Sequence, residues 1–390
     1  MNVATKPLDA GKSVADHISP QSIKPIDVFV HLSQGQGAED WERRWRSGEL
    51  IGINDPTPYG YKRAEDSGCR IRFSQVVANE GKLAKLSRFA VGGLLGFDFV
   101  HALRNAKSIC SAEIVWTHTE RQFLAVALLL CLRSKRARRP KLIGQSVWLI
   151  DHWRKQPGLH RILHSWLICH GVDMLTFLSP ENLAVAKRLF PKTPSELVLY
   201  GIPSEQKNPP ALRSVSPVKI IAVGNDRHRD WKAAIAAVRG QSDIELTIVS
   251  QTAPRRLMKG VDNVRIITLS SNDELFRLYD DSTLVLVPLK QNMHAGGITV
   301  IQEAALRGIP VIASDTGGLR AYFEGEAVCY VRPEDPQAIL RAIRTLVDDP
   351  SAMLSMAQKA QRRMDEGGLG ASSYVARHVE LSERLLKRNE

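Results

Sequence analysis

One stretch of the sequence combines a turn-forming glycine with several cations in a way that could hold a phosphate group. The segment "VGNDRHRDWK", Val223–Lys232, follows an apolar run typical of a buried strand and precedes a helical pattern. Gly224 permits a tight turn at the strand end. Arg227, Arg229 and Lys232 lie where the helix begins, so that side chains and free N–H groups together could neutralise a diphosphate without a metal ion. A solvated surface loop is the alternative interpretation.

A second stretch, "HAGGITVIQEAALRGIPVIASDTGG" (His294–Gly318), carries glycines, a helical pattern and an acidic residue in that order. Gly296 and Gly297 could let a phosphate approach the backbone at a helix N-terminus, where unpaired N–H groups and the positive end of the helix dipole favour anions. The apolar spacing predicts a helix over 299–307. Glu303 lies on that helix and could accept hydrogen bonds from ribose hydroxyls. The alternative interpretation is that Glu303 is an ordinary solvated helix residue.

Acidic and imidazole side chains follow two predicted strands in the first half of the chain. Glu120 follows "EIVWTH" after one intervening residue, Thr119, and Asp151 with His152 comes at the end of "KLIGQSVWLI". A carboxylate that leaves a buried strand into a cleft can deprotonate a hydroxyl within hydrogen-bond reach, so Asp151 is the leading candidate for a base. Aspartate is also a common helix N-cap, and both interpretations of Asp151 stay open.

Metal ligands are not expected. His160 and His164 are four residues apart, but the acidic residue of a zinc-protease helix and nearby cysteine ligands are missing, which favours ordinary helix histidines. The five cysteines are odd in number and scattered, without a C-x-x-C pair. This spacing argues against a disulfide framework and against a zinc knuckle.

The elements that position these residues are buried strands that alternate with helical segments. Nine apolar, β-rich runs are expected to be strands: 26–32, 113–118, 141–150, 174–179, 219–224, 245–250, 263–268, 283–289 and 310–314. Continuous apolar strands with helical crossovers indicate parallel sheets covered on both faces, and the pattern occurs twice. The fold class is therefore α/β, with two Rossmann-like domains that face each other across a cleft.

The domain boundaries follow from composition. Four prolines in "PSEQKNPPALRSVSPVK" (203–219) exclude an internal strand or helix and predict a linker. The expected organisation is a loose N-terminal tail at 1–25, an N-terminal acceptor-binding domain at 26–203, a linker at 204–218, a C-terminal nucleotide-sugar-binding domain at 219–370, and a C-terminal helix at 371–390 that could return to the N-terminal domain.

These stretches resemble a known family. The glycine loop, Glu303, "GIPVIAS" and "TGG" occur in the order found in the donor-binding signature of GT-B glycosyltransferases, particularly those of family 4 (group 1). The resemblance extends from Lys219 to about Pro350. It implies that the C-terminal domain binds a nucleotide-diphosphate sugar of the UDP or GDP type. It implies no cofactor and no metal.

The resemblance also assigns individual residues. Glu303 matches the second glutamate of the family's glutamate pair, which holds the ribose. Ala295 occupies the place of the first glutamate, which departs from the pattern and leaves the sugar and the retaining stereochemistry undecided. The resemblance assigns a donor-binding role to Arg229, Lys232, Gly296, Gly297, Ile298, Thr299 and Glu303. Gly224, Lys290 and His294 join the predicted donor-binding residues because they lie in or directly before the same two stretches.

The first half resembles the family only in outline. The stretch "HLSQGQG" follows the first strand and supplies a cleft-facing loop with Gln34, Gly35 and Gly37. The strand ends that carry Glu120, Asp151 and His152 lie where related enzymes place catalytic or sugar-contacting residues. If the reaction retains configuration, Asp151 could simply orient the acceptor.

The charge distribution points to an anionic partner for the first half. Of the net charge of +12, the residues up to Glu205 carry +9, from 28 basic and 19 acidic side chains. Cations are mixed with leucine and phenylalanine in the stretch "KLAKLSRFAVGGLLGFDFVHALRNAK" (82–107). Cations are concentrated in the stretch "RSKRARRPK" (133–141). They predict contact with an anionic membrane surface, each cation contributing about 1 kcal/mol. A solvated basic face is the alternative. Nucleic acid is a weaker candidate, because no recognition motif accompanies the charge.

Taken together, the sequence predicts a glycosyltransferase that transfers a sugar to a lipid-linked or polysaccharide-precursor acceptor in surface-polysaccharide synthesis, with retention of configuration. The polar N-terminus and the shortness of the apolar runs predict a cytoplasmic protein, peripheral on the inner face of the plasma membrane. A sugar-nucleotide epimerase or hydrolase on the same fold and a non-catalytic nucleotide-sugar-binding relative are the alternatives.

Overall fold

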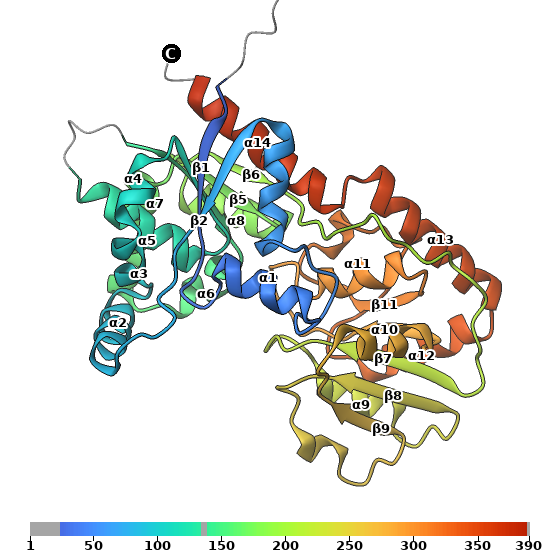
Figure 1. Cartoon of the computed structure of the whole chain (residues 1–390). Helices are drawn as coiled ribbons and strands as arrows, with labels where there is room; N and C mark the ends of the chain where they lie inside the picture. Colours follow the sequence, from blue (N-terminus) through green and yellow to red (C-terminus); the bar gives the residue numbers. More distant parts are fainter. Residues whose placement is uncertain (1–23, 134–138, 388–390) are drawn as a thin grey trace, which may run out of the picture.

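A computed structural model of the chain describes residues 24–133 and 139–387. Two six-stranded sheets, each entirely parallel and flanked by helices, make up the two domains (Figure 1). This confirms the predicted α/β class with two Rossmann-like domains. No helix in the described ranges is both long enough and apolar enough to span a membrane.

The N-terminal sheet has the strand order β2-β1-β3-β4-β5-β6. Its strands are β1 (Ile26–His31), β2 (Cys69–Phe73), β3 (Ile114–Thr117), β4 (Lys141–Ser146), β5 (Met174–Phe177) and β6 (Ser195–Leu197). The helices are α1 (Ala38–Arg46), α2 (Lys82–Leu95), α3 (Phe99–Arg104), α4 (Ala106–Ser111), α5 (Glu120–Cys131), α6 (Leu149–His152), α7 (Gly158–Gly171) and α8 (Pro180–Leu189), with 3₁₀ helices at Pro58–Ser67 and Trp153–Lys155.

The C-terminal sheet has the strand order β12-β11-β10-β7-β8-β9. Its strands are β7 (Val218–Val223), β8 (Ile244–Val249), β9 (Val264–Ile267), β10 (Leu284–Val287), β11 (Val311–Ser314) and β12 (Cys329–Val331). The helices are α9 (Trp231–Val238), α10 (Asn272–Asp280), α11 (Ile298–Leu306), α12 (Pro336–Val347) and α13 (Pro350–Glu366), with 3₁₀ helices at Arg255–Met258 and Leu319–Ala321.

Three strands are absent from the sequence prediction, and all three lie at the edge of a sheet: β2, β6 and β12. In β2 the arginines alternate with Cys69, Ile71 and Phe73, and only Cys69 is fully buried, so this strand has no continuous apolar run. β6 and β12 are three residues long. Edge strands are covered on fewer sides, which is why their hydrophobic pattern is weak.

Helix starts in the C-terminal domain are fixed by short polar side chains. The carboxylates of Asp230, Asp335 and Asp349 cap α9, α12 and α13, and the Ser271 hydroxyl caps α10, each accepting a hydrogen bond from a backbone N–H three residues later. The cap of α9 matters for the site, because it ends the loop that begins at Gly224.

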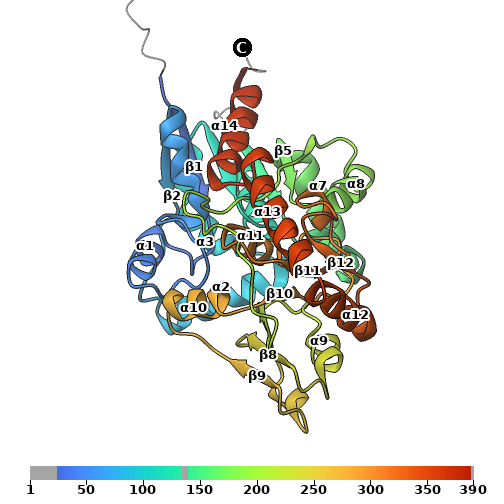
Figure 2. The same cartoon turned by 90° about the vertical axis from the view of Figure 1, so that its right-hand side faces the viewer.

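The last helix, α14 (Ala371–Lys387), crosses back to the N-terminal domain after α13 has packed on the C-terminal one (Figures 1 and 2). The Trp116 indole N–H donates to the Ser382 hydroxyl at 2.9 Å, and the Tyr374 hydroxyl donates to Oε1 of Gln145 at 2.6 Å. The chain therefore connects the two domains twice, through residues 198–217 and through residues 367–370.

Candidate functional site

A cavity of about 460 Å³ lies between the two domains at the carboxyl ends of the C-terminal strands, the edge where open α/β sheets bind ligands. The N-terminal domain contributes Arg44, Glu49, Ile51 and Gly52 to its wall. Of the predicted donor-binding residues, the cavity is lined by Gly224, Arg229, Gly297, Thr299 and Glu303. We refer to it as the donor cavity.

Arg229 lies in the wall of the donor cavity, and its side chain is packed between two glycines. A Cβ atom at Gly224 would collide with the guanidinium, and one at Gly297 would lie 2.7 Å from Nη1 of Arg229. Both glycines have positive φ, at 150° and 78°. The glycines therefore make room for an arginine side chain.

The Arg229 guanidinium is buried, and no carboxylate among the described residues forms an ion pair with it. It is 6% exposed, neither Nε nor Nη1 has a hydrogen-bond partner, and Asp226 and Glu303 attract it only at longer range. Burial lowers the pKa of Arg229, because a charge removed from water is costly. Buried polar groups in proteins are normally paired, so two orphaned N–H donors beside a cavity indicate that an anionic ligand completes the site.

Glu303 is buried in α11 at 5% exposure, which excludes the interpretation as a solvated helix residue. Its Oε1 accepts the backbone N–H of Ile53 at 3.0 Å, and its Oε2 accepts the Tyr279 hydroxyl at 2.8 Å. Burial raises the pKa of Glu303. Each carboxylate oxygen can accept a further hydrogen bond, so Glu303 still suits a ligand hydroxyl.

A loop of the N-terminal domain, residues 48–54, covers this end of the donor cavity. Besides the Ile53 contact, the Gly52 N–H donates to Oδ1 of Asn272 at 2.8 Å, and the Asn272 N–H donates to the carbonyl of Gly48 at 3.2 Å. Gly52 has a φ of 102°, and a Cβ atom there would lie 2.6 Å from Oε1 of Glu303. Glycine is therefore required for this close approach.

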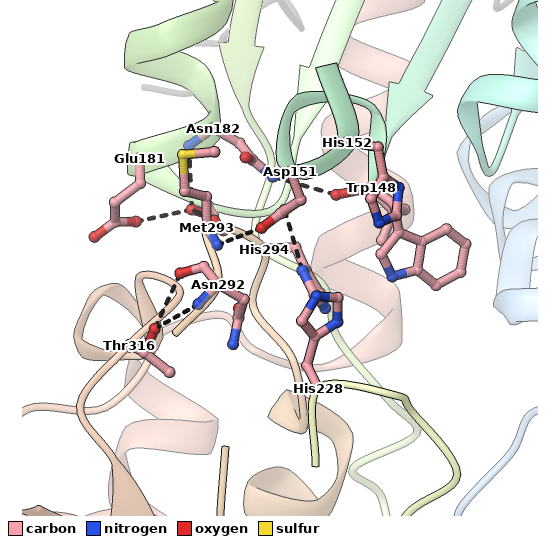
Figure 3. Close-up of polar contacts among 12 residues, drawn as sticks. Trp148, Asp151, His152, Glu181, Asn182, His228, Asn292, Met293, His294 and Thr316 are labelled. Carbon is pink, nitrogen blue, oxygen red and sulfur yellow. Dashed lines mark hydrogen bonds and ion pairs between the residues drawn. The ribbon is translucent and has the colours of Figure 1, made fainter. Parts of the chain in front are cut away.

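Asp151 does not cap a helix; its side chain reaches across the cleft (Figure 3). Oδ1 accepts the Met293 N–H at 2.7 Å, and Oδ2 accepts the Nδ1–H of His294 at 3.1 Å. Burial opposes ionisation, but the hydrogen bonds from His294 and Met293 lower the pKa of Asp151. A stabilised carboxylate with both oxygens engaged is a weak base, so the geometry supports a positioning role for Asp151 better than proton abstraction.

His294 is bonded on its other side to Asp226. Its Nε2 lies 3.2 Å from Oδ2 of Asp226, while Oδ1 of Asp226 accepts the backbone N–H and the Nδ1–H of His228 at 2.8 and 3.0 Å. Burial disfavours a charged imidazole, but the two carboxylates raise the pKa of His294 to about 9. At neutral pH His294 is therefore an imidazolium.

Asp226, His228 and His294 bring three possible metal-ligating atoms within 4.8 Å of one another. Both ring nitrogens of His294, both carboxylate oxygens of Asp226 and Nδ1 of His228 are engaged in hydrogen bonds. We therefore assign the cluster as a hydrogen-bonded network.

Glu120 and His152 lie near Asp151 without contacting the donor cavity. Glu120 is buried, and its Oε2 accepts the backbone N–H groups of Val147 and Trp148 at 3.1 and 3.2 Å, so it holds the turn that leads into α6. Burial raises the pKa of Glu120. His152 contacts the Arg227 guanidinium at 3.2 Å, and burial and that cation lower the pKa of His152.

The remaining predicted donor residues lie outside the donor cavity. Lys232 and Lys290 are exposed and line a neighbouring cavity of about 420 Å³, whose wall also includes Arg229. The Gly296 N–H donates to the carbonyl of His294 at 2.7 Å and is thus already engaged. Ile298 is buried in the core at the start of α11.

The predicted cleft loop lies partly at a third cavity, of about 690 Å³, in the N-terminal domain, and partly in a packed region. Gln34 and Gly35 line that cavity, whereas Gly37 packs against Val76. His31 and His101 also line it, with rings stacked at 5.0 Å. Burial lowers the pKa of His31 to about 3, which keeps its imidazole neutral. Sequence reasoning missed both histidines, although His31 lies in the first predicted strand, 26–32, one residue before its end.

The architecture defines the class of protein: two facing Rossmann-like domains with a nucleotide-type cavity between them are the GT-B fold. Residues 218–349 match the family described as "Glycosyl transferases group 1". The C-terminal domain is therefore similar to the group 1 glycosyl transferases, and the resemblance predicted from the glycine loop is confirmed.

Solved structures share the fold over almost the whole chain. Sucrose-phosphate synthase from Thermosynechococcus elongatus is 16% identical, with a TM-score of 0.68 over 93% of this chain and 100% of that one. Anabaena Alr3699/HepE, in complex with UDP-glucose, is 12% identical, with a TM-score of 0.66 over 92% of this chain and 99% of that one.

Curated relatives match in sequence over part of the chain. Glycogen synthase of Mycobacterium tuberculosis is 24% identical over 228 residues, which are 53% of this chain and 54% of the relative. D-inositol 3-phosphate glycosyltransferase of Kineococcus radiotolerans is 26% identical over 223 residues, 54% of this chain and 49% of the relative. The chain thus spans about half the length of the curated relatives that it matches.

Proposed function

We propose that this protein is a glycosyltransferase that moves a sugar from a nucleotide-diphosphate donor, of the UDP or GDP type, to a hydroxyl of its acceptor. The observation that carries the proposal is the buried Arg229, whose two unpaired N–H groups face the place where a diphosphate would lie beside Glu303. The family of the C-terminal domain supports it, as does the UDP-glucose bound to the related HepE.

In this proposal the donor lies along the donor cavity, with its ribose at Glu303 and its diphosphate at Arg229 and the N-terminus of α11. Positive charge and N–H groups that are already in place stabilise the departing diphosphate, and positioning supplies the remaining acceleration. No cofactor or metal ion is required for these steps. Ala295 is buried at the position where the family pattern has its first glutamate, so retention of configuration is a proposal that product analysis must test.

We further propose that the acceptor is a lipid-linked saccharide or another polysaccharide precursor, bound by the N-terminal domain at the inner face of the plasma membrane. Helices α2 and α7 contact each other, since Nε2 of His160 and His164 lie 2.8 and 3.1 Å from the carbonyls of Leu94 and Leu95. Exposed apolar side chains on the two helices form what we call the apolar patch: Leu83, Leu86, Phe89, Leu94, Leu159, Ile162 and Trp166.

Exposed cations accompany the apolar patch: Lys82, Lys85, Arg154, Lys155 and Arg161. Apolar side chains flanked by cations are the composition of surfaces that bind anionic membranes. Lys85 and Phe89 also line the 690 Å³ cavity that holds Gln34, which would place a membrane-bound acceptor beside it. Part of the predicted basic tract, residues 134–138, lies outside the described residues.

The test is a thermal-shift panel of UDP- and GDP-sugars with the full chain, followed by transfer assays on membrane extracts with the donor that binds. Appearance of a glycosylated lipid or polysaccharide supports the proposal. Conversion of the nucleotide sugar without acceptor would instead indicate an epimerase or hydrolase. Binding without turnover across a broad acceptor panel would indicate a non-catalytic relative.

A further inference from the structure

Asp226 creates an electrostatic conflict in the proposed donor site. Its carboxylate lines the donor cavity together with Arg229, where the proposed function puts a diphosphate. A carboxylate in the wall of an anion site repels the ligand unless a cation compensates it. The cation that contacts this carboxylate directly is His294, whose Nε2 lies 3.2 Å from Oδ2 of Asp226, while Arg229 attracts the carboxylate at longer range.

Compensation depends on the opposite domain. His294 is 3% exposed, and burial by itself would favour a neutral ring. Asp151 comes from α6 of the N-terminal domain and accepts from both Nδ1 of His294 and the backbone N–H of Met293. Because these contacts join the two domains, opening the cleft would separate Asp151 from His294, so closure supplies the second carboxylate that keeps His294 charged.

Resting on the proposed function, we propose that Asp151 and His294 form a charge-compensating latch. Closure of the cleft lets Asp151 hold His294 as a cation, His294 neutralises Asp226, and the donor cavity thereby becomes able to bind a diphosphate. Asp151, His294 and Asp226 are positioning residues in this scheme, because they act on the ligand through Arg229 and its surroundings. Closure, protonation of His294 and donor binding are thermodynamically coupled, each favouring the others.

The charged and titratable groups that face His294 all enter this coupling: Glu120 from α5, Asp151 and His152 from α6, and Asp226 and His228 from the loop after β7. The two aspartates in direct contact dominate, and together they raise the pKa of His294 to about 9. Donor affinity should therefore be constant around neutral pH and weaken as the pH rises through about 9.

The decisive experiment measures UDP and GDP binding by calorimetry with full-length wild type, His294→Gln, Asp226→Asn and the double variant Asp226→Asn/His294→Gln. His294→Gln should weaken binding on the order of tenfold, within the usual range of coupling between sites. The double variant should recover it, because the uncompensated carboxylate is gone. A purely structural histidine would not be rescued in this way. His170→Gln, an exposed histidine on α7, is the matched control.

A second measurement does not depend on any nucleotide. NMR titration of labelled histidines, with His294 assigned by its loss in His294→Gln, should give a lower His294 pKa in Asp151→Asn than in wild type, and Asp151→Glu should restore much of the difference. An unchanged pKa would overturn the latch. Normal nucleotide binding by His294→Gln would overturn it as well while leaving the proposed function intact, whereas failure of the wild type to bind any nucleotide or nucleotide sugar would count against the function itself.

Discussion

The backbone N–H of Ile53 donates to Oε1 of Glu303 across the cleft, so the residue expected to hold a ribose also holds the opposite domain. Replacing Glu303 with Ala should lower the free energy of unfolding by about 1–3 kcal/mol, because the buried Tyr279 hydroxyl and the Ile53 N–H both lose their acceptor. Nucleotide binding should weaken in the same variant. Urea unfolding and calorimetry measure the two effects.

Glu303→Gln provides the control for that change. It keeps the volume and one acceptor oxygen, so its loss of stability should be smaller than that of Glu303→Ala. Equal stability of wild type and Glu303→Ala would show that the contact with Ile53 contributes nothing in solution.

Gly297→Ala should impair nucleotide binding through Arg229. The new Cβ atom would lie 2.7 Å from Nη1 of Arg229 and 2.6 Å from Cγ1 of Val287, which forces the guanidinium away from the donor cavity. Gly68→Ala is a matched control, because Gly68 has a similar φ of 75° but open space around its Cβ position. Both variants should lose about 1–2 kcal/mol of stability from the left-handed backbone. Only Gly297→Ala should lose affinity for UDP or GDP, as measured by calorimetry; equal affinities would refute the role given to this glycine.

Arg229→Met should separate binding from folding. The ligand-free variant should be as stable as the ligand-free wild type or more stable, because the substitution removes a buried cation whose Nε and Nη1 have no hydrogen-bond partner. The rise in melting temperature on addition of nucleotide diphosphate should disappear. Differential scanning fluorimetry with and without UDP or GDP tests both outcomes. A large fall in the melting temperature of the ligand-free variant would mean that Arg229 serves the fold.

The apolar patch should attach the protein to anionic membranes. The triple variant Leu83→Ser/Leu86→Ser/Phe89→Ser should bind vesicles of phosphatidylcholine and phosphatidylserine more weakly than wild type in flotation assays, because less apolar area enters the interface. Wild-type binding should also weaken with salt. Leu212→Ser, which replaces an exposed leucine of the linker, is the control. Equal flotation of the triple variant and wild type would exclude the patch as the membrane contact.

The sequence predicted the elements whose signal is local. Central strands such as β7 and β10 are buried along their length and therefore read as apolar runs, and the helix after Gly297 shows its own periodicity. The short edge strands lack that signal. Arg229, Gly297 and Glu303 were found because the residues that build the donor cavity lie close together within two stretches.

Contacts that cross the cleft could not be predicted in the same way. Ile53 and Glu303 are 250 residues apart, and Asp151 and His294 are 143 apart, so no periodicity or spacing links them. The position of Asp151 at a strand end indicated a functional residue, but its role depends on a partner that only the assembled domains supply. Lys232 stays a prediction, since it lines the neighbouring cavity, which shares Arg229 with the donor cavity.

The two connections between the domains run side by side where they cross. The Ala371 N–H donates to the carbonyl of Ile202 at 2.9 Å, and Gly201 lies against the backbone of Gly370, where a side chain would collide. Any rotation of one domain relative to the other must therefore twist both segments about a shared axis at this crossing. A protease cut within residues 204–217 would sever only one of the two connections. The nicked molecule should still migrate as a single particle in native gels, because α14 belongs to the C-terminal fragment and packs on the N-terminal domain.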